Sequence, residues 1–258
     1  MNINPYVESV ALFTGGILAG SFCNVAGIRL PVGKSVVRPR SSCMSCGTQL
    51  TALELIPVFS WLLAGGKCRH CKQPISPLYL LGELAAGLLF AFLPYAVKGN
   101  GELLLAYPLA LLLLILTIAD LKYRLLPNKL LYPALLFFFV LRLFLHPLPY
   151  FQYAAGFLLG GGSLLLVSWL FALRGKDGLG GGDIKLMALM GMVLGAKLVF
   201  ICLFLSALLG VAAGGLLLLA GRLKKEEAYL PYGPFIAAAG LFAFCYGEAL
   251  TSWYMALF

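Results

Sequence analysis

Residues 103–120 read LLLAYPLALLLLILTIAD, a long apolar run that ends on a carboxylic acid. About 20 apolar residues span the hydrocarbon core of a bilayer, and this run approaches that length. An acid at the edge of such a run is expensive, because its charged form lies close to hydrocarbon, so Asp120 is a candidate functional residue. The run predicts a membrane-spanning helix with a functional group at its end.

The composition extends this prediction to the whole chain. Hydrophobic residues make up 61% of it and charged residues 11%, and the mean hydropathy is +0.95, which is far from an ordinary soluble domain. We therefore expect an all-α polytopic membrane protein with about eight transmembrane helices. The candidate spans are roughly 7–28, 78–97, 103–121, 130–146, 151–173, 184–196, 198–221 and 235–253, with the break between the sixth and seventh at Gly195 to Lys197.

Basic residues predict the orientation. The first span has no Lys or Arg before it and several after it, so it is not a cleaved signal peptide and its N-terminus is expected outside. All but three of the 19 Lys and Arg residues then fall on the cytoplasmic side, the exceptions being Lys98, Arg142 and Lys197. The net charge of +9 is thus explained by topology and by contact with anionic membrane lipids. The basic residues are not interleaved with aromatic residues, so the sequence does not indicate nucleic-acid binding.

One soluble segment stands out between the first two spans. It contains Cys43-Met44-Ser45-Cys46 and Cys68-Arg69-His70-Cys71, with 21 residues between the two pairs. Two C-x-x-C knuckles are typical of a four-cysteine Zn²⁺ site, because two thiolates on a tight turn occupy one edge of a tetrahedron. Four thiolates leave no open position, so a structural zinc is expected. This gives a first transmembrane helix at 1–28, a cytoplasmic zinc-binding domain at 29–77 and a transmembrane domain at 78–258.

A second acid follows a glycine-rich stretch, GLGGGDIK at residues 178–185. Glycines remove side chains and let another backbone come close, so Gly180, Gly181 and Gly182 are candidate substrate-binding residues. The predicted topology places Asp183 on the same membrane face as Asp120. Two acids sharing one water favour peptide hydrolysis, with one acting as base and the other as acid. Because Asp120 ends one helix and Asp183 begins another, the helix dipole favours Asp183 as the base.

Other interpretations of these acids stay open at this point. Asp183 is also a suitable N-cap for the next helix, and Asp120 a suitable partner for Lys122 or Arg124. At the level of function, the alternatives are an ion-coupled transporter and a non-enzymatic scaffold that presents the zinc loop. With two histidines in the chain, a nucleophilic Ser-His or Cys-His site has little support.

Taken together, these motifs resemble those of the type IV prepilin leader peptidase / N-methyltransferase family of G-x-G-D membrane aspartyl proteases. The resemblance covers nearly the whole chain. The residues that carry it are Gly20–Val25 with Arg29–Pro31, the two cysteine knuckles around Leu55–Trp61, Glu83–Gly87, Asp120 with Pro127–Asn128, Gly180–Leu186, and Tyr232–Phe235.

The resemblance implies an inner-membrane enzyme of type IV pilus or type II secretion systems. Such enzymes cut the basic leader from prepilins or pseudopilins at the cytoplasmic face. Asp120 and Asp183 match the two catalytic positions, and Asp177 falls outside the pair. Members with the cysteine domain also methylate the new N-terminal residue with S-adenosylmethionine, for which no binding residues are identified here. A peptidase with a purely structural zinc loop is the alternative.

Overall fold

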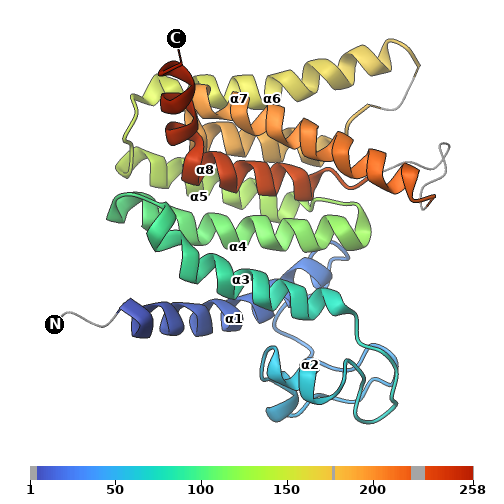
Figure 1. The fold of residues 1–258 in the computed structure, drawn as a ribbon. Helices are drawn as coiled ribbons and strands as arrows, with labels where there is room; N and C mark the ends of the chain where they lie inside the picture. The colour runs from blue at the N-terminus through green and yellow to red at the C-terminus, as the bar shows by residue number, and fades with distance from the viewer. Residues whose placement is uncertain (1–4, 176–177, 222–229, 258) are drawn as a thin grey trace.

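The computed structural model describes residues 5–175, 178–221 and 230–257. Within them the chain is helical, and the β-pairing consists of two isolated bridges in the loop after the first helix. The helices form one bundle with the loop at one end (Figure 1). They are α1 (Pro5–Arg29), η1 (Leu53–Leu55), α2 (Phe59–Leu63), α3 (Pro77–Ala96), α4 (Asn100–Tyr123), α5 (Asn128–Phe144), α6 (Tyr150–Ala172), α7 (Gly181–Leu219) and α8 (Gly233–Met255).

Helix α7 is a hairpin of two arms rather than one straight rod. Gly195 has φ 80° and ψ 173°, a conformation that suits glycine and breaks the helix there. Beyond the break the chain returns, so that Cys202 Sγ lies 3.8 Å from Met187 Sδ. A straight helix would separate these residues by about 22 Å. The predicted break between the sixth and seventh spans is confirmed at Gly195.

Each of the eight predicted spans corresponds to a helix, or to one arm of α7, among the described residues. Among the described residues, six helices are long and apolar enough to cross a membrane: α1, α3, α4, α6, α7 and α8. The two predicted spans at 184–196 and 198–221 are the arms of α7, which counts as one of the six. Helix α5, predicted as a span at 130–146, is not among these six helices. Its 17 residues are at the lower limit of spanning length.

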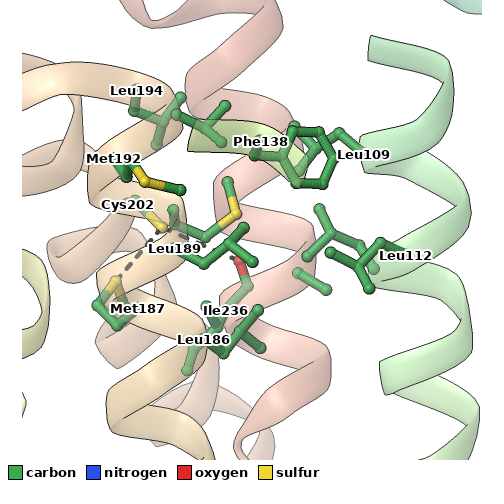
Figure 2. Close-up of a cluster of buried hydrophobic side chains, with 14 of the residues drawn as sticks. Leu109, Leu112, Phe138, Leu186, Met187, Leu189, Met192, Leu194, Cys202 and Ile236 are labelled. Atoms are coloured by element: carbon green, nitrogen blue, oxygen red, sulfur yellow. Dashed lines mark hydrogen bonds between the residues drawn. The ribbon is translucent and has the colours of Figure 1, made fainter. Parts of the chain in front are cut away.

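The first arm of α7 is short, about 21 Å from Gly181 to Leu194, which is less than the hydrocarbon thickness of a bilayer. Every residue from Leu186 to Gly195 is buried. The arm is therefore surrounded by protein, which explains why its sequence is apolar on all sides. Figure 2 shows its side chains meeting those of α4, α5 and α8.

Glycines let α6 lie directly against this arm. A Cβ on Gly156 would overlap the carbonyl oxygen of Gly191, and one on Gly191 would overlap that of Gly156. One turn along α6, a Cβ on Gly160 would lie 2.6 Å from the Met187 oxygen. Small residues allow helices to pack this closely in a membrane. The contact fixes the arm whose first turn carries Asp183.

At the end of the bundle away from the loop, Arg142 of α5 ties three helices together. It is 5% exposed, pairs with Glu102 of α4 through both terminal nitrogens, and donates to the Val193 carbonyl at 2.7 Å. Its guanidinium also lies 5.0 Å from the centre of the Tyr153 ring. This cluster anchors the far ends of α4 and of the first α7 arm.

We expect Arg142→Met to lower the free energy of unfolding by about 2–3 kcal/mol, because it leaves the partly buried Glu102 carboxylate and the Val193 carbonyl without their donor. The matched control is Lys197→Met. Lys197 pairs with Glu248 at 2.9 Å, but both side chains are at least half exposed, and such pairs contribute about 0–1 kcal/mol. Thermal unfolding in lipid nanodiscs compares the two variants. Equal shifts in the midpoint would contradict the anchoring role of Arg142.

Candidate active site and metal centre

Asp120 lies near the loop end of α4 and is 5% exposed. Its Oδ2 accepts a hydrogen bond of 2.8 Å from the backbone N–H of Gly233, the first residue of α8. A Cβ on Gly233 would itself lie 2.8 Å from that oxygen, so only glycine allows this approach. The carboxyl group is therefore held by α8, and Lys122 lies instead 5.5 Å from the centre of the Tyr123 ring.

Asp183 is the third residue of α7, and its backbone N–H donates to the carbonyl of Gly180 at 3.0 Å. The N-cap of this helix is Gly180, so the alternative that Asp183 is the N-cap is wrong. Asp183 and Asp120 are close enough for their charges to interact. The fold thus brings together two carboxyl groups that are 63 positions apart, as the topology predicted.

Tyr232 and Ser206 complete the surroundings of this pair. Their hydroxyl groups are 2.8 Å apart, and the charge of Asp183 also acts on Tyr232. Ser206 comes from the second arm of α7, whereas Tyr232 precedes α8. Tyr232 is followed directly by Gly233, which binds Asp120, so Ser206 and Tyr232 link the second α7 arm to the segment that holds this carboxyl group.

The three glycines before Asp183 differ in their surroundings. A Cβ on Gly182 would lie 2.7 Å from Cβ of Leu126, so this glycine is required for the start of α7 to pack on the preceding loop. Gly181 is exposed, and no described neighbour would lie within 4 Å of a Cβ added to it. Gly180 ends the extended approach to the helix, with φ −60° and ψ 135°. Space for another chain therefore lies beside Gly181.

We expect Gly182→Ala to lower the activity of this site at least tenfold, because Leu126 or the start of α7 must move and carry Asp183 with it. Gly162→Ala is the matched control. It adds the same methyl group to an exposed glycine of α6 with no described neighbour within 4 Å, and should keep the activity within about threefold. Initial rates of the two purified variants test this difference. An equal loss in Gly162→Ala would mean that Leu126 does not set the geometry.

The four knuckle cysteines come together at the loop end of the bundle. Their Sγ atoms all lie within 4.8 Å of one another, and those of Cys43 and Cys71 are 3.8 Å apart. A tetrahedral zinc with Zn–S bonds of about 2.3 Å requires sulfur atoms about 3.8 Å apart. The cluster therefore has the size and donor set of a four-thiolate metal site.

The two knuckles have the same backbone conformation, as separate halves of such a site do. An antiparallel bridge closes each of them, between residues 42 and 49 and between residues 67 and 74. The residue after each second cysteine, Gly47 or Lys72, has a positive φ, and its N–H donates to the carbonyl of the first cysteine. Backbone N–H groups thus turn inward around the sulfur atoms.

These N–H groups also favour thiolates. The N–H of Cys46 lowers the pKa of the Cys43 thiol, and that of Cys71 lowers the pKa of Cys68. The hydrogen bond from the Gln73 N–H lowers the pKa of the Cys71 thiol, but desolvation and the three neighbouring thiols together raise this pKa to about 11. A bound metal ion would also deprotonate the Cys71 thiol, since metal binding deprotonates coordinating thiols.

His70 is not a fifth member of the metal site. Its Nε2 lies 3.8 Å from Glu54, whose carboxylate also accepts the N–H and the hydroxyl of Thr51. The Thr51 backbone N–H, then its hydroxyl, lowers the pKa of Glu54. This cluster supports the second knuckle from outside.

Two contacts of the site have little signal in the sequence. Gly233 has no side chain to indicate a role, although it lies within the Tyr232–Phe235 motif. Lys185 donates to Asn128 Oδ1 at 2.7 Å and so ties the first α7 arm to the start of α5. Asp177 lies outside the described residues.

The fold and the site define a polytopic membrane protein with a paired-aspartate centre and a four-cysteine loop at the same end of its bundle. Comparison with family models is consistent with both parts. Residues 14–97 match the Bacterial Peptidase A24 N-terminal domain, and residues 107–215 match the Type IV leader peptidase family. The chain belongs to the type IV leader peptidase family.

Curated relatives extend over nearly the whole chain. A prepilin leader peptidase/N-methyltransferase of Bacillus subtilis is 38% identical, covering 95% of this chain and 96% of the relative. Relatives with the same name from Aeromonas hydrophila and Pseudomonas putida are each 34% identical, covering 98% and 91% of this chain and 96% and 89% of the relatives. No solved structure gives a significant match.

Proposed function

We propose that this protein cleaves the leader peptide from prepilins or pseudopilins and then N-methylates the new N-terminus. The observation that carries the peptidase function is the meeting of Asp120 and Asp183, held by Gly233 on one side and by the start of α7 on the other. The family and the names of the relatives support both activities.

Peptide cleavage by this pair follows acid–base chemistry. One carboxylate takes a proton from a water molecule as the water attacks the scissile carbonyl. The other carboxyl group, protonated, donates to the carbonyl oxygen, and the leaving amine is protonated as the C–N bond breaks. Because close carboxyl groups cannot both ionise cheaply, the pair shares one proton in the resting enzyme.

The expectation that Asp183 is the base and Asp120 the acid is no longer supported. It rested on Asp120 lying at a helix C-terminus and Asp183 at an N-terminus. The structure also places Asp120 at the N-terminus of α8, through the bond to Gly233. The helix dipole therefore does not single out Asp183 as the base, and the two acids act as one titrating unit.

The substrate backbone is proposed to reach the aspartates through the open space beside Gly181. Peptide bonds in a helix are shielded, so the scissile segment has to unwind before it lies along residues 180–182. The excess of basic residues on one side of the spans supports a cytoplasmic active site and an external N-terminus in the bacterial inner membrane. The same excess of basic residues favours contact with anionic lipids, and a nucleic-acid partner is not needed to explain it.

The proposed metal is Zn²⁺ with a structural role, bound by Cys43, Cys46, Cys68 and Cys71. Four thiolates complete its coordination and leave no position for substrate. The 29–77 segment would then serve the methyltransferase activity and 78–258 the peptidase activity. S-adenosylmethionine supplies the methyl group when bound.

The experiment is co-expression with a prepilin, followed by mass spectrometry of the pilin. We expect the leader to be lost with the wild-type protein and retained with Asp183→Ala, and the mature N-terminus to carry a methyl increment. Loss of the leader with Asp183→Ala would contradict the peptidase proposal. A mature pilin without the increment would leave the peptidase-only alternative.

A further inference from the structure

A cavity of about 800 Å³ lies between the helix ends and the cysteine loop. Residues of α1, α3 and the end of α4 form its floor, and the loop from Val32 to Ser76 forms the rest. Its volume is in the range of sites for small-molecule ligands. Neither Asp120 nor Asp183 lines it, so peptide cleavage leaves this cavity unexplained. We propose that it binds the methyl donor, an adenosyl amino acid with a sulfonium centre, which rests on the proposed N-methyltransferase function.

Trp61 gives this cavity a rigid aromatic wall. Its Nε1 donates to the Ile75 carbonyl at 3.4 Å, which fixes the ring. Behind the ring, Gly66 has φ 66°, and a Cβ there would lie 2.7 Å from the indole. A fixed aromatic face stacks on a flat base and attracts a positive centre such as a sulfonium. The proposed ligand has both groups, a flat adenine base and a positive sulfonium centre.

The charges of the lining distinguish this ligand from the leader peptide. Six basic residues line the cavity: Arg29, Lys34, Arg38, Lys67, Arg69 and Lys122. The two acids are already engaged, since Glu83 accepts the Val58 N–H at 2.7 Å and Glu54 accepts the Thr51 N–H at 3.0 Å. Six like charges repel a leader that carries several basic residues, whereas single lysines and arginines of the lining offer partners for the carboxylate of an amino-acid ligand, with its sulfonium placed at the Trp61 face.

Helix α4 separates the cavity from the aspartate pair. Asp120 bonds to α8, whereas Lys122 and Tyr123 of the same helix line the cavity. Two residues along an α-helix correspond to a rotation of about 200°, so Asp120 and Lys122 project from opposite faces. The mature N-terminus released at Asp120 would therefore pass around a helix end about 10 Å wide before methylation.

The transfer step needs no dedicated base. An N-terminal amine has a pKa of about 7.7–8.0, so a neutral fraction is present near pH 7. Its lone pair forms the new C–N bond with the methyl carbon while the C–S bond breaks. The sulfonium becomes a neutral thioether, and the amine, now secondary, loses its extra proton to solvent.

The test measures binding of S-adenosylhomocysteine, the unreactive product, to the purified protein in nanodiscs by isothermal titration calorimetry. Trp61→Leu should weaken binding about tenfold or more, because it removes the stacking face. Lys34→Glu should weaken it about fivefold, and the matched control Lys98→Glu, an exposed lysine at the other end of the bundle, should leave it unchanged. Zinc content and leader cleavage should stay normal in all three variants.

Unchanged affinity in Trp61→Leu, or equal affinity in Lys34→Glu and Lys98→Glu, would overturn the assignment. A wild-type protein that removes leaders but does not bind the probe would also overturn it, while the peptidase function stands. Lys34→Glu keeps the test decisive if Trp61→Leu loses zinc, because Lys34 is exposed and outside the knuckles.

Discussion

Asp183→Asn and Asp120→Asn should each lower the rate of leader cleavage by about 10²–10⁴, the usual contribution of a positioned acid or base. Asparagine keeps the size of the side chain, so the bond from Gly233 to position 120 can still form, whereas the ability to exchange a proton is lost. Rates are measured with purified protein and a synthetic prepilin N-terminal peptide in nanodiscs.

Glu248→Gln is the matched control for these variants. Glu248 is more than half exposed and pairs with Lys197. It lies 15 residues along α8 from Gly233, the residue that binds Asp120, and so about 22 Å away along the helix. The same loss of one carboxylate should leave cleavage within about twofold there. A comparable loss in Glu248→Gln would show that net charge, not the aspartate pair, controls the rate.

Cys68→Ser should reduce bound zinc from one ion per chain to less than a tenth of that, because a structural site of this type contributes about 10–16 kcal/mol that depends on all its ligands. Cys68 is 4% exposed and belongs to the four-sulfur cluster. Cys245→Ser is the control, since Cys245 lies on α8, outside the cluster. Metal content is measured by inductively coupled plasma mass spectrometry.

The same variant separates the two proposed activities. Methylation should be lost, because the loop that walls the cavity no longer folds. Leader cleavage should continue, because Asp120, Asp183 and Gly233 come from α4, α7 and α8. Full zinc content in Cys68→Ser would contradict the four-cysteine site, and equal loss of both activities would contradict a separate role for the loop.

Local signals made much of this fold predictable. The break at Gly195 could be foreseen because glycine adopts positive φ easily and interrupts an apolar run. The two C-x-x-C pairs predicted a cluster because each pair, on a tight turn, supplies two of the four thiolates of a tetrahedral site. The meeting of Asp120 and Asp183 followed from counting spans, which put both acids on one face.

What could not be predicted depends on contacts between distant segments. Gly233 supports Asp120 only because α8 begins beside α4, 113 positions later in the chain. The sequence predicts Arg142 as a charge at an outer helix end. In the structure it is buried, because Glu102 and the Val193 carbonyl on two other helices accept its hydrogen bonds. Helix α5 was predicted two residues too late, because Asn128 starts it directly after Pro127.

The central claim is that Asp120 and Asp183 form one hydrolytic unit. Its most direct test compares cleavage rates of Asp120→Asn, Asp183→Asn and the double variant under identical conditions. Residues that act as a unit are strongly non-additive, so the double variant should be no slower than the slower single variant. If the rate losses instead multiply, the two aspartates act independently and the claim of one hydrolytic unit is wrong.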